Sequence, residues 1–420
     1  MSRSQLQVPR GTFDLLGDDA TARVALEARA RAILEGAGYE RIETPAFEAT
    51  ELFARGVGSS TDIVRKEMFT FEDAGGRSLT LRPEGTAPVC RAFVEHGMHK
   101  RSKPVKLWYL SSFFRHERAQ RGRHRQFWQV GAEALGSDDP AVDAEAIALA
   151  RRLLAETGVR DVRLRLSSLG SADTRVAYRE QLKAHLRAHE QSLSTEVRER
   201  IEENPLRAFD SEHAETRQVM ASAPKLLDQL EREDAEHFEE VRALLDEAHV
   251  EYELDATLVR GLDYYTRTVF EFTSDALGAQ SGVGGGGRYD RLVEELGGPP
   301  TPGMGWACGI ERMLLAGGEA QASARSALDL FVALESRDEN LRRPAFAVLD
   351  QARAAGLSAQ MELAGRSLKR QLSHADALGA RFVAIVGTEH TVLKDMQAGQ
   401  QEPVAPDAVV HAVLRGQHAL

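Results

Sequence analysis

The alternation of apolar and polar residues is clearest between Leu107 and Gly136, where it predicts two strands joined by a loop. Leu107–Arg115 is aromatic and aliphatic, and Arg125–Leu135 alternates with a period of two, the spacing at which side chains share one face of a strand. One face of the second strand is apolar and is expected to join the core: Trp128, Val130, Ala132 and Ala134. The other face carries an aromatic ring, an amide and a carboxylate: Phe127, Gln129, Gly131 and Glu133. A strand with a purely structural role does not need such a row.

The loop between these strands is basic. Within eleven residues it contains Arg115, Arg118, Arg121, Arg123 and Arg125. Arginines beside the polar row suggest a ligand that has both phosphates and an amine. The alternative is an exposed hairpin with a solvated tip.

The pattern before residue 170 predicts an α+β domain with many antiparallel strands. The expected elements are a helix at Ala20–Gly36, a strand in residues 39–48 ending at Pro45, a hairpin of Met68–Asp73 and Arg77–Arg82, a short helix after Pro83 to Thr86, a helix at Asp143–Thr157 and a strand at Val162–Ser167.

Three further regions follow. Ser171–Asp255 is charged and mostly helical, and is interpreted as an inserted helical module. Strands are expected again at Leu254–Val259 and Thr266–Thr273, followed by the glycine run Gly282–Gly287, a helix at 288–296, a strand at 303–310 and a helix at 311–318. From Ala327 on, strands alternate with helices, which predicts a small α/β domain with a parallel or mixed sheet.

Charge is unevenly distributed along the 420 residues, whose net charge is −11. Ser171–Asp255 holds 22 acidic and 11 basic residues of the 64 and 53 in the whole chain, so the remainder has 42 of each and is neutral. This balance argues against indiscriminate nucleic-acid binding by a globally basic surface, but it allows local contact through the basic hairpin.

Composition narrows the cellular context. No apolar run is long enough to span a bilayer, and residues 1–10 are polar. Cys90 and Cys308 lie far apart and offer neither metal-ligand spacing nor a disulfide framework, so a reducing cytoplasm is expected. The 13 histidines show no zinc-site spacing, and no Ser-His-Asp set is evident.

Two short segments add candidate ligand groups. Glu84 follows a proline at a strand end, where its carboxylate could hold an ammonium group with help from Thr86; the alternative is a helix N-terminal glutamate that favours the helix dipole. Arg260 is followed by Gly261, which lets the chain turn. A buried guanidinium needs an anionic partner, so Arg260 is hard to explain as packing alone.

Aromatic and small residues complete the set. Tyr264 and Tyr265 could line a planar polar substrate or be ordinary half-buried strand residues. The glycines Gly284–Gly287 allow backbone to approach a ligand closely, or form a loose turn, and Arg312 starts a helix beside another strand of small residues. Together, these residues provide acceptors for an amine, arginines for phosphates and an aromatic ring for a base. This combination suits activation of an amino acid by ATP.

With these residues, the sequence resembles a known family, the class II aminoacyl-tRNA synthetases, and within them the histidyl-tRNA synthetases. Residues 113–133 resemble the second class II motif, residues 303–315 the third, and residues 39–48 the first, with Pro45 at a dimer contact. Residues 258–272 and 286–298 resemble the two histidine-specific motifs. Residues 367–387 resemble the anticodon-binding domain, and Asn204 to Arg207 is similar to the family's insertion domain.

The resemblance implies a role for each matching residue. Histidine would be held by Glu84, Gly85, Thr86, Gln129, Glu133, Tyr264 and Tyr265, with the ammonium on Glu84, Thr86 and Gln129 and the imidazole on Glu133 and Tyr265. ATP would be held by Arg115, Arg123, Phe127 and Arg312, with Arg115 and Arg260 at the α-phosphate as the catalytic pair. Arg118 and Gln120 would meet the acceptor end of tRNA.

The resemblance also implies partners and boundaries. It implies L-histidine, ATP with bound Mg²⁺, tRNA(His), a homodimer, no membrane, and no metal held by a protein motif. The expected divisions are a class II antiparallel-sheet catalytic core at 1–170 and 254–320, a helical insertion at 171–253, and an α/β anticodon-binding domain at 327–420.

Some residues depart from the family pattern. Ser111 and Ser112 replace a Gly-Pro pair that is usual in the family, and Ala119 replaces a usual proline. Gly284 and Gly285 replace a frequent Cys-Ala pair near the pocket, where the two glycines leave more room. The alternative function is a non-catalytic, histidine-sensing paralogue such as the regulatory subunit of ATP phosphoribosyltransferase. Such a paralogue usually lacks the Arg260 motif, the basic loop and the C-terminal domain, all of which this sequence has.

Overall fold

The computed structural model describes residues 6–58, 61–118, 120, 122–258, 262–278, 281–317 and 328–417. Two compact units, 1–324 and 325–420, each have their own core. Among the described helices, none combines the length and apolar character needed to cross a membrane.

An eight-stranded sheet forms the centre of the first unit, in the order β1-β5-β6-β11-β10-β9-β7-β8. Its strands are β1 (Glu40–Arg41), β5 (Val105–Phe114), β6 (Gln126–Leu135), β7 (Val162–Ser168), β8 (Glu253–Leu254), β9 (Thr266–Ser274), β10 (Gly282–Arg288) and β11 (Gly303–Gly309). The six inner strands pair antiparallel, and only the two-residue edge strands β1 and β8 pair parallel. The α+β prediction is therefore confirmed.

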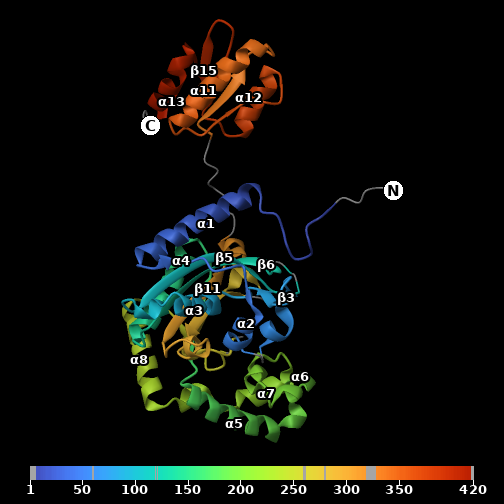
Figure 1. The fold of residues 1–420 in the computed structure, drawn as a ribbon, viewed down its shortest axis with the longest axis vertical. Helices are drawn as coiled ribbons and strands as arrows, with labels where there is room; N and C mark the ends of the chain where they lie inside the picture. Colours follow the sequence, from blue (N-terminus) through green and yellow to red (C-terminus); the bar gives the residue numbers. More distant parts are fainter. Residues whose placement is uncertain are drawn as a thin grey trace, which may run out of the picture. The chain divides into compact units, whose positions relative to one another are not determined.

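Helices cover both faces of this sheet (Figure 1). α1 (Gly17–Gly36), α4 (Pro140–Glu156) and α10 (Ile310–Gly317) contribute to the main core, together with Val130, Ala132 and Ala134 of β6. On the other face, α3 (Thr86–Glu95) packs with Tyr109 in a second cluster. The period-two pattern of β6 thus correctly predicted its core side.

A small three-stranded sheet lies before α3. β2 (Phe47–Ala49), β3 (Phe69–Glu72) and β4 (Ser78–Leu81) pair antiparallel, and the β3–β4 hairpin confirms the predicted one. α2 (Thr50–Gly56) and a one-turn π-helix (Ile63–Glu67) connect β2 to β3.

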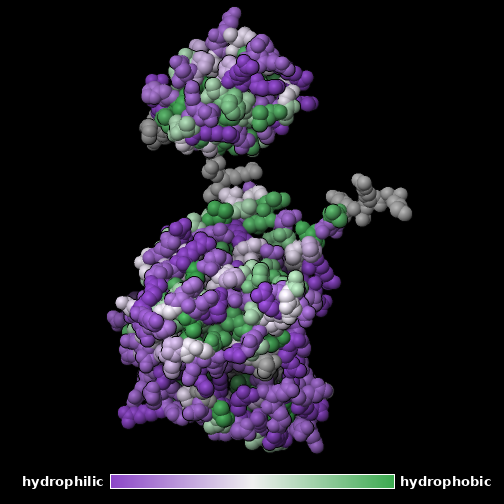
Figure 2. Space-filling view, in the orientation of Figure 1, coloured by the Kyte–Doolittle hydropathy of each residue, from purple (hydrophilic) through white to green (hydrophobic). Residues whose placement is uncertain are grey.

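The insertion has a hydrophobic cluster of its own. Its elements are α5 (Ala172–Ala188), α6 (Thr195–Arg200), a 3₁₀ segment (Pro205–Asp210) and α7 (Ala214–Ala221), and they pack around Tyr178, Leu182 and Leu186. Figure 2 shows a mostly hydrophilic surface over these helices, in keeping with their charged composition. α8 (Arg232–Glu247) instead places Phe238 and Val241 in the main core, and α4 is its neighbour.

Three predicted elements are wrong in extent. The strand expected to end at Pro45 stops at Arg41, because the carbonyls of Thr44 and Pro45 accept hydrogen bonds from the Arg82 guanidinium instead of from a neighbouring strand. The strand expected at Leu254–Val259 stops at Leu254, because the Asp255 carboxylate accepts hydrogen bonds from Thr257 and starts a turn. Val259 lies outside the described residues.

The third error concerns the helix expected from residue 288, which begins only at Leu292, as α9 (Leu292–Glu295). The preceding glycine run, for which close approach to a ligand and a loose turn were both open, forms strand β10, and Arg288 ends that strand. Only Val283 and Arg288 of this strand have side chains, so its sequence shows no period.

The second unit confirms the predicted α/β domain with a mixed sheet in the order β13-β12-β14-β15-β16. Its strands are β12 (Leu330–Leu334), β13 (Ala359–Met361), β14 (Phe382–Val386), β15 (Thr391–Asp395) and β16 (Gln401–Val404), and its helices are α11 (Arg342–Ala354), α12 (Leu368–Ala377) and α13 (Val409–Gln417). Leu330 and Val332 face one hydrophobic cluster, and Phe331 and Ala333 face another. Both faces of this sheet are therefore buried, as in a typical α/β layer.

Candidate active site

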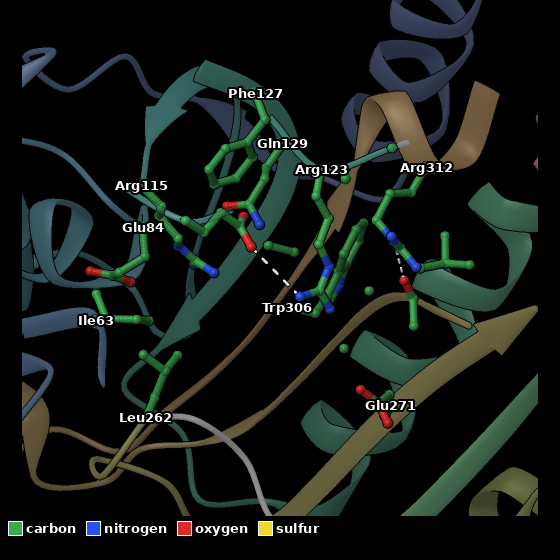
Figure 3. A pocket seen from close by; sticks show the side chains of 18 of the residues that line it. Ile63, Glu84, Arg115, Arg123, Phe127, Gln129, Leu262, Glu271, Trp306 and Arg312 are labelled. Atoms are coloured by element: carbon green, nitrogen blue, oxygen red, sulfur yellow. Dashed lines mark hydrogen bonds and ion pairs between the residues drawn. The ribbon is translucent and has the colours of Figure 1, made fainter. Parts of the chain in front are cut away.

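A cavity of about 660 Å³ opens on the face of the large sheet away from the main core. Its walls come from the β5–β6 hairpin, from strands β9 to β11, from the π-helix and from α10 (Figure 3). Among the residues predicted from the sequence, it is lined by Glu84, Gly85, Arg115, Arg123, Phe127, Gln129, Tyr265, Gly284, Gly285 and Arg312.

Glu84 lies just before α3, so its expected position at a helix N-terminus is confirmed, whereas its ammonium-binding role stays a prediction. Its carboxylate accepts hydrogen bonds from the backbone N–H groups of Thr86 (2.7 Å) and Ala87 (3.0 Å), as a residue at a helix N-terminus does. It also lines the cavity, although it is only 4% exposed. Burial raises the pKa of Glu84 despite these hydrogen bonds, so its ionised form is disfavoured here and a cation beside it would stabilise that form.

Glu133 is fully buried behind the cavity wall and is surrounded by hydroxyl groups. Its carboxyl group accepts hydrogen bonds from Thr86 Oγ1 (2.8 Å), Tyr109 (3.3 Å) and Tyr289 (2.5 Å). Burial raises the pKa of Glu133 to about 8. Glu133, Thr86 and Tyr264 do not themselves line the cavity.

Tyr264 and Tyr265 occupy different positions. Their ring centroids lie 4.8 Å apart. The Tyr264 hydroxyl lies 3.5 Å from Glu84 Oε2, and Tyr265 reaches the cavity. Burial raises the pKa of Tyr264 well above its usual value, so its hydroxyl keeps its proton and can donate.

The predicted phosphate-binding arginines line the same cavity: Arg115 lies beside Glu84, and Arg123 and Arg312 lie farther along it (Figure 3). Arg115 Nε donates to the Pro83 carbonyl (2.9 Å), and its guanidinium carbon lies 5.3 Å from the centre of the Phe127 ring. Arg123 Nη1 is 3.6 Å from Glu117 Oε2, and Arg312 Nε donates to the Gly282 carbonyl (Figure 3). Burial, and then the charge of Arg123, lower the pKa of Arg312. Two neighbouring cations that repel each other form a suitable site for a polyanion.

The remaining predicted residues do not join this cluster in the described structure. Arg118 and Gln120 are exposed on the loop, where Gln120 forms an isolated backbone bridge with Arg123. Arg260 and Gly261, like Ala119 and Arg121, lie outside the described residues.

The glycines of β10 and β11 are required by their neighbours. A Cβ atom at Gly284 would lie 2.4 Å from Cys308 Sγ, and one at Gly305 would lie 1.7 Å from Glu133 Oε2. The room expected beside Gly284 is thus filled by the Cys308 side chain.

Sequence reasoning missed Tyr109 and Tyr289, which donate hydrogen bonds to Glu133. A signal for Tyr109 was available: Gly131 lies opposite it in the β5–β6 pair, and a Cβ atom at Gly131 would lie 2.4 Å from the tyrosine ring. Five further cavity carboxylates were also missed, those of Asp62, Glu67, Glu117, Glu271 and Glu311.

Within the part of the chain that the structure describes, no cluster of three or more His, Cys, Asp or Glu residues is arranged to hold a metal ion. An antiparallel sheet with a cavity on one face, lined by carboxyl groups and arginines, is the arrangement of a class II aminoacyl-tRNA synthetase core.

Comparisons with known proteins identify the family. The family model described as Histidyl-tRNA synthetase matches residues 11–313, and the one described as Anticodon binding domain matches residues 330–415. Histidine–tRNA ligase of Halorhodospira halophila is 47% identical over 432 aligned positions, which cover 99% of each chain. That of Acaryochloris marina is 45% identical over 405 positions and covers 95% of this chain and 94% of the relative. The chain therefore belongs to the histidyl-tRNA synthetase family.

Solved structures agree with this assignment. The structure of apo histidyl-tRNA synthetase from S. aureus matches with a TM-score of 0.81 and 34% identity, and covers 97% of this chain and 100% of that one. A protein from Bacillus halodurans described as an ATP phosphoribosyltransferase regulatory subunit/histidyl-tRNA synthetase matches with a TM-score of 0.64 but only 23% identity, covering 89% and 98%. That second match shows the shared fold alone, and the family assignment supports the ligase function over the regulatory alternative.

Proposed function

We propose that this chain attaches L-histidine to tRNA(His) in two steps, through a histidyl-adenylate, in the cavity described above. The observation that carries this proposal is that a single cavity is lined both by the acceptors Glu84 and Gln129 and by the arginines Arg115, Arg123 and Arg312. An amino acid and a nucleoside triphosphate would bind next to each other in this cavity.

Glu84, Thr86 and Gln129 hold the ammonium group. The imidazole of histidine is recognised by Tyr265, which lines the cavity, and by the carboxyl group of Glu133, which lies behind the cavity wall. Because tyrosines and Thr86 already hydrogen-bond to Glu133, this buried group is oriented before the substrate arrives. Orientation of this kind lowers the barrier by reducing the entropy lost on reaching the reactive geometry.

Phe127 stacks on adenine, Arg115 holds the α-phosphate, and Arg123 and Arg312 hold the outer phosphates. The histidine carboxylate attacks the α-phosphorus in line, and pyrophosphate leaves. Arg260 faces the α-phosphate as a fixed positive charge. The 3′-hydroxyl of the terminal tRNA adenosine then takes the acyl group, and AMP leaves. Stabilisation of developing charge by fixed cations typically contributes several kcal/mol.

Mg²⁺ enters with ATP as part of the substrate. Mg²⁺ typically binds phosphate oxygens, water and one or two protein carboxylates. Glu117 and Glu271 line the cavity, and their carboxylates are the protein oxygens that fit this role. The ion neutralises phosphate charge when it is bound.

The remaining partners and boundaries are also proposed. Arg118 and Gln120 meet the acceptor end of tRNA, and residues 327–420 read its anticodon. The divisions at residues 170, 253 and 320 follow the predicted domain limits. Two free, buried cysteines suit a reducing cytoplasm.

A homodimer is proposed with the segment after Pro45 at its interface. Phe47 and Phe71 lie on the two edge strands of the three-stranded sheet, one on each side of β4, with ring centroids 6.2 Å apart, and they are 50% and 42% exposed. Light scattering tests this proposal, and a monomer at micromolar concentration would contradict it.

Charging of purified tRNA(His) with radiolabelled histidine tests the whole function. We expect acylation that requires ATP. A protein that binds histidine but never acylates tRNA would be a histidine sensor instead.

A further inference from the structure

Strand β9 begins with a distortion at Arg267. The φ angle of Arg267 is +46°, a left-handed conformation that is unfavourable for a residue other than glycine. The pairing with β10 shifts at the same place, since Gly287 lies opposite Val269 while Arg288 lies opposite Thr266. Such bulges redirect a strand and occur frequently beside active sites.

The helical insertion has two connections to the sheet, one at its start and one at its end, and both form hydrogen bonds with this distorted residue. At the first connection, the Arg267 N–H donates to the Gly170 carbonyl (2.8 Å) and the Arg267 carbonyl accepts from Leu169 N–H (2.7 Å). At the second connection, in α8, Arg267 Nε lies 2.8 Å from Asp234 Oδ1 and Nη2 lies 2.6 Å from Glu233 Oε1.

Asp234 joins the two connections to each other. Its side chain is 2% exposed, and its second oxygen accepts a 2.6 Å hydrogen bond from the N–H of Ser171, the residue that caps α5. The carboxylate therefore ties the start of the insertion, its end and Arg267 at a single point. A buried carboxylate that accepts a hydrogen bond on each oxygen, one of them from a guanidinium, resists displacement.

The distorted residue lies two positions after Tyr265, which lines the cavity. The Tyr265 carbonyl accepts a hydrogen bond from Arg175 Nη1, and Arg175 belongs to α5 of the insertion. Thr266, between them, has its hydroxyl 3.3 Å from Asp290 Oδ2. The side chain of Tyr265 lines the cavity, and its backbone is thus hydrogen-bonded to the insertion.

We propose that Arg267 is a positioning residue, which acts through Asp234 and the two insertion connections to place Tyr265 against bound histidine. This inference rests on the proposed function, in which Tyr265 contacts the imidazole. Arg267 itself touches no substrate. The insertion is consequently part of the apparatus for histidine recognition, in addition to any contact that it makes with tRNA.

Arg267→Gly removes the side-chain contacts of Arg267 and leaves the backbone conformation unstrained, because glycine adopts φ near +46° without strain. Histidine affinity by calorimetry, the KM values for histidine and ATP in pyrophosphate exchange, and the melting temperature are measured for each variant. We expect R267G to weaken histidine binding and to raise the KM for histidine at least tenfold, with the KM for ATP changed less than twofold. R267K should recover part of this loss, and D234N should reproduce it.

Arg163→Gln is the matched control. It removes an exposed ion pair with Asp275, which follows the far end of β9 (side chains 58% and 56% exposed), and it should leave every value unchanged. Unchanged histidine affinity in R267G would overturn the inference, as would an equal rise in both KM values together with a lower melting temperature. Absence of exchange by the wild-type protein would contradict the proposed function, whereas the calorimetric comparison tests the positioning role without catalysis.

Discussion

The hydroxyl of Thr86 donates a 2.8 Å hydrogen bond to the carboxyl group of Glu133, and both side chains are buried beside the proposed histidine site. The two residues lie 47 positions apart in the sequence. This contact connects the N-terminus of α3 to the C-terminal part of β6, and thereby connects the proposed ammonium acceptors to the proposed imidazole acceptor.

The Glu133 carboxyl group should make stability depend on pH. Burial raises its pKa from the usual 4.5 to about 8, so between these values the folded protein keeps a proton that the unfolded chain releases. Stability contributed by this group is therefore greatest at low pH and falls as the pH rises through that window, by on the order of a few kcal/mol. Burial also raises the pKa of Glu84, which adds a contribution of the same sign.

We therefore expect urea unfolding of the ligand-free protein to show lower stability at pH 8 than at pH 6, with a smaller difference in Glu133→Gln. Glu239→Gln, an exposed change on α8, is the control and should behave as wild type. An undiminished pH dependence in Glu133→Gln would show that the carboxyl group is ionised in the folded protein at both pH values.

The buried ion pair between Arg288 and Asp143 should be essential for stability. Both side chains are 0% exposed, and Asp290 also contacts Arg288, at 3.2 Å. Arg288→Met would leave buried carboxylates without their cation, and we expect it to lower the unfolding free energy by about 3–5 kcal/mol. The double variant Arg288→Met/Asp143→Leu should recover part of that loss in urea unfolding, and a double variant as unstable as the sum of the singles would contradict this reasoning.

The predictions made from the sequence succeeded where side chains carry a periodic signal. The alternation in Arg125–Leu135 correctly placed Val130 and Ala132 in the core and directed Phe127 and Gln129 into the cavity. The periodic signal failed at β10, because four consecutive glycines have no side chains to show a period. It also failed at Asp255, where the carboxylate accepts hydrogen bonds from the chain that follows and ends a strand.

The part of the site that the sequence did not predict depends on the register in which the strands pair. Tyr109 and Tyr289 reach Glu133 from β5 and from the end of β10, and that meeting is determined by which residues pair across the sheet. A single sequence contains no direct record of that pairing. The family resemblance supplied residue roles that periodicity could not, and those roles stay predictions.

Arg260, which lies outside the described residues, is expected to act in the chemical step. Arg260→Ala should leave histidine binding largely intact and should reduce histidine-dependent ATP–pyrophosphate exchange by orders of magnitude, since a charge that stabilises only the transition state affects the rate and not substrate affinity. Calorimetry with histidine is the control for binding. Unchanged exchange would remove Arg260 from the mechanism.

The second compact unit should matter for tRNA and not for adenylate formation. It has its own hydrophobic clusters on both faces of its sheet, so deletion of residues 327–420 should leave the first unit folded. We expect the deletion to reduce tRNA charging far more than pyrophosphate exchange. An equal loss of both activities would indicate that this unit supports the catalytic core or the dimer instead.

The most direct test of the central claim, that the cavity activates histidine with ATP, is pyrophosphate exchange measured with each of the twenty amino acids, with and without tRNA. The structure and the family predict exchange with histidine alone and no requirement for tRNA. Absence of exchange with histidine, in a folded protein that binds it, would contradict the claim.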